Sequence, residues 1–238
     1  MVFRCLSSGS EQGNCYTLTD SKGEILILDC GISEKDVKIG IGFQIAKIKG
    51  VLVTHMHEDH LKSADKLKKI GLKVLRPFDN DTDYKPIKLG DYYIQPFELT
   101  TADGTPTHSN GDSTPCRCFG YFIKHPELGK MVYITDTYLI KQNFSKVKLN
   151  HILVSANYDE NAISDDLSAK NFHILQGHMS IQNLCSNFLV TSNSDELKNV
   201  ILCHLSKENA ESNRFKEMAQ EVVDCNVVIA TKGVEIKL

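Results

Sequence analysis

The sequence lacks a hydrophobic segment long enough to cross a membrane. No apolar run in the 238 residues approaches the roughly 18 that a transmembrane helix needs. The opening residues, MVFRCLSSGS, also lack a basic segment followed by an apolar one, so we expect no signal peptide and predict a cytoplasmic protein. No Pro-, Gly- or Ser-rich linker, repeat or low-complexity tract divides the chain. We therefore predict one domain that spans residues 1–238.

The sequence also lacks an excess of positive charge and a disulfide pattern. Its formal net charge is −3, so any binding of nucleic acid must depend on a local basic patch. The 8 cysteines are scattered, often inside apolar runs, which indicates buried thiols in a reducing compartment rather than a disulfide framework. Cys116 and Cys118 form a CxC pair, but one such pair without a second is a weak indication of a metal site.

The most informative segment is residues 51–60, where an apolar run ends in three histidines and an aspartate. Side chains of this kind are poor core material, but they are good metal ligands. In an extended conformation the imidazoles of His55 and His57 point to the same face. Asp59 and His60 follow where a turn into a helix would direct them to a second point nearby. The segment therefore predicts two pairs of ligands for two adjacent ions.

Short apolar segments alternate with helical patterns along the whole chain, which predicts a layered α/β fold. The strands are predicted at Cys15–Thr19, Glu24–Asp29, Gly50–Thr54, Tyr92–Glu98, Cys118–Lys124, Met131–Thr135, His151–Ser155, Val200–His204, Asn226–Ala230 and Val234–Lys237. The helices are predicted at about Ser33–Lys47, Leu61–Ile70, Ile181–Val190 and Lys207–Val223, the last with Ser206 as its N-cap.

Polar side chains follow five of the predicted strands, at the point where each strand ends: Asp29, His55, Asp136, Asn157 and His204. Any one of them could be a hydrogen-bonded turn residue. Together they favour a site that is built along one edge of a sheet system.

The pattern His55-x-His57-x-Asp59-His60 resembles the signature of the metallo-β-lactamase fold, and the family's other site residues follow in the same order. Asp29, His108, Asp136 and His204 match an Asp before the signature and a His, an Asp and a His after it. The resemblance runs from about residue 3 to the C-terminus. It implies an α/β fold of the four-layer αββα sandwich type.

The resemblance also implies a dinuclear metal site. One ion would be held by His55, His57 and His108, and the other by Asp59, His60 and His204. Asp136 would bridge the two ions together with a water or hydroxide, and Asp29 would support a ligand from outside. Imidazole and carboxylate ligands suit Zn²⁺, with Mn²⁺ or Fe as alternatives. His108 lies in a turn-rich loop, in which Asp103 and Asp112 are alternative donors.

Three segments resemble the YycJ/WalJ group of nuclease-like enzymes: the Ser/Gly-rich start at residues 6–16, Gly177–Ser180 and His204–Asn209. The last two also occur, in looser form, in the tRNase Z branch. The resemblance makes His178 a candidate to stabilise a phosphate or protonate a leaving oxygen, so Asp59 and His178 are the expected catalytic residues. An N-capping turn with a bystander histidine is the alternative for His178.

The substrate and partners are predicted from the same features. Lys62, Lys66, Lys69 and Lys73 have helical spacing, and they either track a nucleic-acid backbone or form a solvated helix face. The stretch between Asp136 and His204 is too short for the extra domain of β-CASP nucleases. Residues 159–176 are expected to form a flexible loop that gates the cleft or mediates contacts in a homodimer.

We therefore predict a metal-dependent phosphodiester hydrolase, in the manner of YycJ/WalJ-like exonucleases acting on DNA or RNA, with no membrane partner. The alternatives are a small-molecule phosphodiesterase for cyclic nucleotides or cyclic ribose phosphates, and a non-catalytic metal-binding module.

Overall fold

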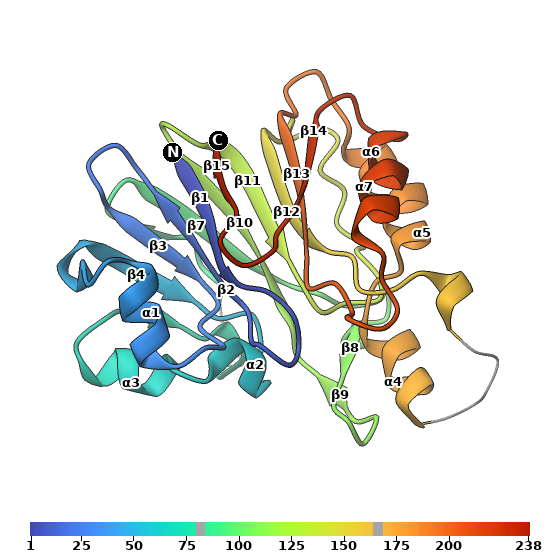
Figure 1. Ribbon diagram of the computed structural model, residues 1–238, viewed down its shortest axis with the longest axis horizontal. Coiled ribbons are helices and arrows are strands. Elements are labelled where there is room, and N and C mark those ends of the chain that lie inside the picture. The colour runs from blue at the N-terminus through green and yellow to red at the C-terminus, as the bar shows by residue number, and fades with distance from the viewer. Residues whose placement is uncertain (80–83, 164–168) are drawn as a thin grey trace.

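Two β-sheets pack face to face in the computed structural model, which describes residues 1–79, 84–163 and 169–238. Helices from the first third of the chain cover the outer face of one sheet, and helices from its last third cover the outer face of the other (Figure 1). These four layers are the αββα sandwich that the sequence predicts, so the predicted fold class is confirmed.

The first sheet contains six strands in the order β15-β1-β2-β3-β4-β5. Their bounds are Val2–Ser7 for β1, Cys15–Thr19 for β2, Ile25–Leu28 for β3, Ile48–Leu52 for β4, Val74–Leu75 for β5 and Glu235–Lys237 for β15. Strands β3, β4 and β5 run parallel to one another, whereas β15, β1, β2 and β3 are antiparallel neighbours. The last strand of the chain thus pairs with the first.

The second sheet contains seven strands in the order β14-β13-β12-β11-β10-β7-β6. Their bounds are Ile87–Leu89 for β6, Tyr92–Glu98 for β7, Phe119–His125 for β10, Gly129–Ile134 for β11, His151–Ser155 for β12, Asn199–Cys203 for β13 and Asn226–Ile229 for β14. Strands β11 to β14 are parallel, and every residue of β12 and β13 is buried. Burial on both faces explains why these two strands are largely apolar. A separate pair is formed by β8 (His108–Ser109) and β9 (Pro115–Cys116).

The helices are short, and their bounds are Glu34–Gly40 for α1, Glu58–Leu61 for α2, Ala64–Lys69 for α3, Ala169–Gly177 for α4, Ile181–Asn183 for α5, Val190–Ser192 for α6 and Ser212–Gln220 for α7. A π-helical segment, Leu184–Leu189, joins α5 to α6, and 3-10 turns occur at Ile45–Lys47, Pro77–Asp79 and Glu160–Ala162. Among the described residues, no helix combines the length and the apolar character needed to cross a membrane.

Three apolar clusters hold the layers together. The central one lies between the sheets and includes Phe3, Tyr16, Leu28, Tyr121 and Tyr133, all fully buried. A second cluster lies between the first sheet and helices α1 to α3, and a third lies between the second sheet and helices α5 to α7. Burial of apolar surface contributes about 25 cal/mol per Å², so these three interfaces supply most of the stabilisation of the sandwich.

The sandwich brings the carboxyl ends of parallel strands from both sheets to one edge. Asp29 follows β3, Asp136 follows β11, Asn157 follows β12 and His204 follows β13, while His55 lies three residues beyond the end of β4. All five were predicted to line one edge of a sheet system. In open α/β sheets this end of the strands is where ligands bind.

The ten predicted strands match strands of the structure closely, but the sequence does not predict β1, β5, β6, β8 or β9. The helix predicted over 61–70 is two helices, α2 and α3, separated at residues 62–63, and two other helix predictions are too long. The helix predicted over 33–47 ends at Gly40, because Gly42 and Phe43 have positive φ values of 61° and 59°. The helix predicted from residue 207 begins at Ser212. Ser206 does not cap it, because its hydroxyl accepts from the backbone N–H of Asn209 in a separate turn.

The prediction of a flexible loop over 159–176 is wrong for residues 169–176, which belong to α4. Ile174 of α4 is buried against the rest of the fold, a tertiary contact that the polar local sequence does not indicate. The acidic pair at residues 165 and 166, on which the loop prediction drew, lies outside the described residues.

The buried imidazole of His151 makes the stability of the fold depend on pH. Its Nδ1 accepts from the side-chain amide of Asn199 at 3.0 Å. Burial and the nearby Lys198 lower the pKa of His151 to about 4. In the unfolded chain this pKa is about 6.5, so the unfolded state binds the proton more tightly and stability falls as the pH falls from about 6.5 to 4.

We expect His151→Gln, which keeps an uncharged acceptor for Asn199, to remove this part of the acid sensitivity. Between pH 7 and pH 5 the free energy of unfolding of the wild type should fall by an extra amount on the order of 2 kcal/mol relative to the variant. Urea denaturation of metal-free protein at both pH values measures this difference. Equal losses for the two proteins would show that His151 does not carry the effect.

Candidate metal centre

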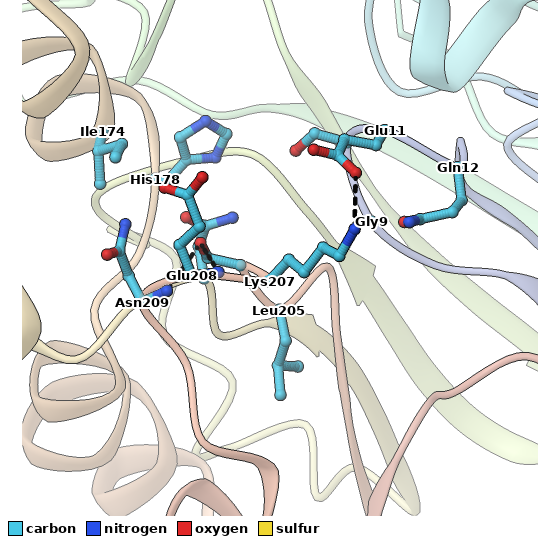
Figure 2. Close-up of a pocket in the computed structure, with 12 residues that line it drawn as sticks. Gly9, Glu11, Gln12, Ile174, His178, Leu205, Lys207, Glu208 and Asn209 are labelled. Carbon is cyan, nitrogen blue, oxygen red and sulfur yellow. Dashed lines mark hydrogen bonds and ion pairs between the residues drawn. The ribbon is translucent and has the colours of Figure 1, made fainter.

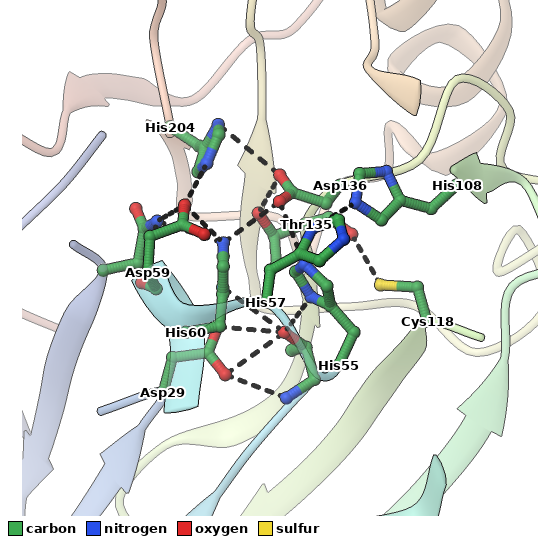
Figure 3. Close-up of polar contacts among 12 residues, drawn as sticks. Asp29, His55, His57, Asp59, His60, His108, Cys118, Thr135, Asp136 and His204 are labelled. Carbon is green, nitrogen blue, oxygen red and sulfur yellow. Dashed lines mark hydrogen bonds and ion pairs between the residues drawn. The ribbon is translucent and has the colours of Figure 1, made fainter. Parts of the chain in front are cut away.

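Two groups of nitrogen and oxygen donors lie side by side at this edge (Figure 3). The first group contains His55, His57 and His108, and the second contains Asp59, His60, Asp136 and His204. Within each group the donor atoms lie within 4.8 Å of one another. The structure thus brings together all seven residues that the sequence predicts as metal ligands, although they come from positions 55 to 204.

The signature residues lie between the end of β4 and the start of α2. The chain is still extended at His57 (φ −68°, ψ 145°), which is the N-cap of α2. The rings of His55 and His57 are 4.7 Å apart between centroids, and both belong to the first group. Asp59 and His60 fall in the single turn of α2 and belong to the second. This is the division into two pairs that the spacing predicts.

The first group has donor atoms that a cation would satisfy. His108 donates from Nδ1 to the carbonyl of Gly177 at 2.7 Å, which leaves Nε2 as an acceptor, 3.0 Å from Nδ1 of His57. His57 in turn donates from Nε2 to the side-chain oxygen of Asn110 at 2.9 Å. The lone pairs of His108 Nε2 and His57 Nδ1 thus face each other, with no proton between them. Nε2 of His55 is buried and makes no hydrogen bond with any residue that the structure describes. The three residues therefore fit a divalent metal ion.

The second group is arranged around the carboxylates of Asp59 and Asp136. Nε2 of His60 lies 3.3 Å from Asp59 Oδ2 and 3.0 Å from Asp136 Oδ2. His204 places Nε2 at 3.4 Å from Asp59 Oδ2 and Nδ1 at 3.4 Å from Asp136 Oδ1. Two imidazoles and two carboxylates within this range are a donor set that suits a hard or borderline divalent ion.

Asp136 belongs to the second group and also contacts the first. Its Oδ2 lies 3.4 Å from Nε2 of His55, in the first group, and 3.0 Å from Nε2 of His60, in the second. The side chain is almost completely buried. This geometry is what a ligand shared between two adjacent ions requires.

The charges of the centre are strongly coupled. Burial opposes ionisation of Asp136, but His204 and His60 hold its pKa well below the usual range. Burial likewise opposes protonation of His60, but Asp136, Asp29 and Asp59 raise its pKa. In the first group burial lowers the pKa of His55, and it lowers that of His108 to about 3. Ionised Asp136 and neutral His55 and His108 are therefore already in the forms that bind metal, whereas His60 would give up a proton when an ion binds.

Asp29 supports the centre from outside it. Its buried carboxylate accepts from Nδ1 of His60 at 2.7 Å and from the backbone N–H of Thr54 at 2.8 Å. It also accepts from the hydroxyls of Thr54 and Tyr133. The contact with His60 fixes the ring so that its Nε2 faces Asp59 and Asp136. Asp29 therefore orients a ligand, which agrees with the supporting role that the resemblance implies.

Asn14 and Asn157 are polar residues at the centre whose roles the sequence does not reveal. The fully buried amide of Asn14 lies 3.2 Å from Asp59 Oδ2 and 3.1 Å from His60 Nε2. That of Asn157 lies 3.1 Å from His204 Nδ1. Asn14 belongs to the Ser/Gly-rich start and Asn157 follows a strand, and these positions are the signals that point to them.

His178 lies over the centre without belonging to either group. Its Nδ1 is 3.6 Å from Asp136 Oδ1, and its ring stacks on that of His204 with centroids 5.5 Å apart. Ser180 caps the following helix by accepting from the backbone N–H of Asn183. The N-capping turn and the histidine near the reactive centre, weighed as alternatives in the sequence, are therefore both present.

The alternatives to His108 are excluded by their positions. Asp103 bonds to Thr101 and Thr105, and Asp112 bonds to Thr114, all within exposed turns. His108 is buried, and a Cβ at Gly177 would lie 3.1 Å from its Nδ1, so the glycine leaves room for the ring. All 8 cysteines are free thiols, and Cys116 and Cys118 belong to neither donor group.

The fold and the two donor groups define the class of the protein. The family model of the metallo-beta-lactamase superfamily matches residues 8–146, more than half of the chain. The chain belongs to this superfamily, and it is a metal-dependent hydrolase with His and Asp residues placed to bind metal ions.

The relatives give the particular resemblance. The chain is 25% identical to the exodeoxyribonuclease YycJ of Bacillus anthracis over 97% of this chain and 90% of that protein. Its fold is similar to that of the metallo-beta-lactamase fold protein YhfI from Bacillus subtilis, with a TM-score of 0.69, 16% identity and coverage of 99% and 98%. It is also similar to the short form of human tRNase Z, with a TM-score of 0.62, 14% identity and coverage of 99% and 98%.

We expect Asp29→Asn to weaken metal binding at the second group. An amide cannot accept from all four donors that surround Asp29, so His60 loses its fixed orientation, and such changes cost about 10–100-fold in metal affinity. Titration with zinc against a competing chelator measures the affinity. Asp20→Asn, a buried carboxylate at a distant turn, is the matched control and should keep wild-type affinity. Wild-type affinity in Asp29→Asn would contradict the assigned role.

Proposed function

We propose that this protein is a dinuclear metal-dependent phosphodiester hydrolase that degrades nucleic acid from an end. The observation that carries the proposal is the position of Asp136, whose carboxylate contacts His55 of one donor group and His60 of the other. A purely structural metal site has one closed coordination sphere, whereas two adjacent donor groups with a shared carboxylate are typical of hydrolytic centres. The similarity to an exodeoxyribonuclease supports the choice of substrate.

The first group would hold one ion through His55, His57 and His108, and the second would hold another through Asp59, His60 and His204, with Asp136 shared. Zn²⁺ suits this mixture of imidazole and carboxylate, and Mn²⁺ or Fe would also be accepted. Two bound divalent ions lower the pKa of a coordinated water and stabilise charge on the phosphoryl oxygens.

His178 is the residue that we assign to the leaving group. It is near Asp136 and stacked on His204, yet it also lines the groove beside the centre. A histidine placed this way can hold a proton next to the oxygen that departs from phosphorus. Asp59, at the other side of the second group, is fixed by Asn14 and orients the reacting groups through its carboxylate.

The groove beside His178 is the substrate site of this proposal (Figure 2). It has a volume of about 280 Å³, with Asn157 and His178 among its lining residues and Glu11 and Lys207 paired across it at 3.3 Å. This volume lies at the small end of ligand sites. It therefore also favours the second candidate, a phosphodiesterase acting on a cyclic nucleotide or cyclic ribose phosphate.

The thiols support the compartment that the sequence predicts. Seven of the 8 free cysteines are buried and none forms a disulfide, which supports a reducing environment. We accordingly propose that the protein acts in the cytoplasm.

A panel of substrates separates the two candidate functions. Protein loaded with zinc or manganese is incubated with linear DNA, single-stranded RNA, 2′,3′- and 3′,5′-cyclic nucleotides and bis(p-nitrophenyl) phosphate. We expect release of mononucleotides from the linear polymers and turnover of bis(p-nitrophenyl) phosphate. Turnover of cyclic nucleotides without degradation of polymers would replace the nuclease with the small-molecule phosphodiesterase.

We expect His178→Ala to bind two equivalents of metal but to hydrolyse slowly, with kcat lower by about 10²–10⁴-fold. The loss should be smaller for bis(p-nitrophenyl) phosphate, because nitrophenolate leaves without a proton. Metal analysis and rates on both substrates measure this. Loss of a metal ion from the variant would instead make His178 a ligand.

A further inference from the structure

Three hollows lie next to one another around the loop Gly9–Gly13, and we call them together the groove. The first, of about 280 Å³, is the substrate site beside His178. The second, of about 330 Å³, is lined by Asp59 of the metal centre together with Glu11, Glu58 and Lys62. The third, of about 500 Å³, shares Gln12 and Lys62 with the second. Gln12 lines all three, and Lys62 lines the second and third. The shared residues place the three hollows in a row from the metal centre to the surface around α1.

The loop that forms one wall of this groove is held in a fixed shape. Gly9 donates its backbone N–H to the side-chain oxygen of Asn14, and Gly13 donates to the carbonyl of Gly9 at 2.9 Å. The carbonyl of Gln12 accepts from the hydroxyl of Ser7. Glu11 and Gln12 are left exposed at the tip. A polymer that left the centre past this loop would meet a preformed surface.

The far end of the groove is positively charged. Arg4, Lys62 and Lys232 line the third hollow, with Asp36 as the acidic residue among its lining. Arg4 is paired with Glu235, and Asp36 accepts from the hydroxyl of Ser33. Lys62 and Lys232 have no ion-pair partner in the part of the chain that the structure describes. Two uncompensated cations at the end of a groove are notable in a chain whose net charge is −3.

We infer that this groove guides a single nucleic-acid strand away from the metal centre, and that Lys62 and Lys232 bind its backbone phosphates. The inference rests on the proposed function and extends it, because it makes the substrate a polymer rather than a single nucleotide. Positively charged grooves that track the backbone are the usual means of binding single strands, and the two lysines would contact phosphates, which all nucleotides share. The path is thus expected to be independent of sequence.

The lysines of α3 offer a contrast within the same region. Lys66 and Lys69 are exposed and carry the same charge, and they belong to the helical stripe noted in the sequence, but they are absent from the lining of the three hollows. If the groove is the path, their charge contributes only weakly through solvent. They are therefore matched controls for a general effect of charge.

The test compares Lys232→Glu with Lys66→Glu. Binding of a fluorescently labelled phosphorothioate oligothymidylate to the zinc-loaded protein is followed by anisotropy at several salt concentrations. We expect Lys232→Glu to weaken binding of a long oligomer by about tenfold. We expect Lys232→Gln to lower the slope of log affinity against log salt by about 0.7, which is the value for one phosphate contact on a single strand. Lys66→Glu should change the affinity for the oligomer, and the slope against salt, by much less.

Substrate length provides the second readout. Lys232→Glu should raise KM for a long oligothymidylate without changing its kcat, and should leave a dinucleotide and bis(p-nitrophenyl) phosphate unaffected. If Lys232→Glu binds the oligomer with unchanged affinity, or if Lys66→Glu loses as much affinity, the inference that the groove binds a nucleic-acid strand is wrong. If the wild type does not turn over bis(p-nitrophenyl) phosphate at all, the proposed function is refuted instead. The binding measurement would still show whether the groove binds a nucleic-acid strand.

Discussion

The contact of the Asp136 carboxylate with imidazoles of both donor groups is the interaction on which the rest of the structure depends. Asp136, His55, His60 and His204 are all buried, and taking ionised groups out of water costs several kcal/mol each unless partners compensate. The compensation here comes from oppositely charged neighbours, and divalent ions would complete it at the first group. A centre of this kind is costly for stability, so its presence indicates function.

The sheets keep these costly groups in place, because the ligands lie at the ends of strands whose backbone is fixed. Asp29, Asp136 and His204 follow parallel strands and have positive φ values of 54°, 45° and 54°. This backbone conformation is uncommon for residues other than glycine, and it is found at sites where the surrounding structure enforces it. The sheets fix the backbone at these positions. Hydrogen bonds from Asp29 and Asn14 then orient the side chains of His60 and Asp59. Gly177, the glycine before His178, leaves space for the ring of His108.

The sequence alone predicts the signature and ten of the 15 described strands, because both are local, and it misses β1, β5, β6, β8 and β9. His55 and His57 share a face through their spacing, and β12 is a short apolar segment with a polar residue at each end. It does not predict α4, which depends on burial of Ile174, or the start of α7, which depends on the turn around Ser206. The supporting amide of Asn14 is equally hidden, because a hydrogen bond between distant residues leaves no periodic pattern. The sequence places Asn157 at the edge of the site, but it does not show the hydrogen bond of its amide to His204.

The most direct measurement is an anomalous-diffraction map of the zinc-loaded protein. Two peaks about 3.5–4 Å apart are expected, one beside His55, His57 and His108 and the other beside Asp59, His60 and His204, with Asp136 between them. A single peak within one group, or two peaks without Asp136 between them, would contradict the central claim that this carboxylate joins two metal ions into one hydrolytic centre.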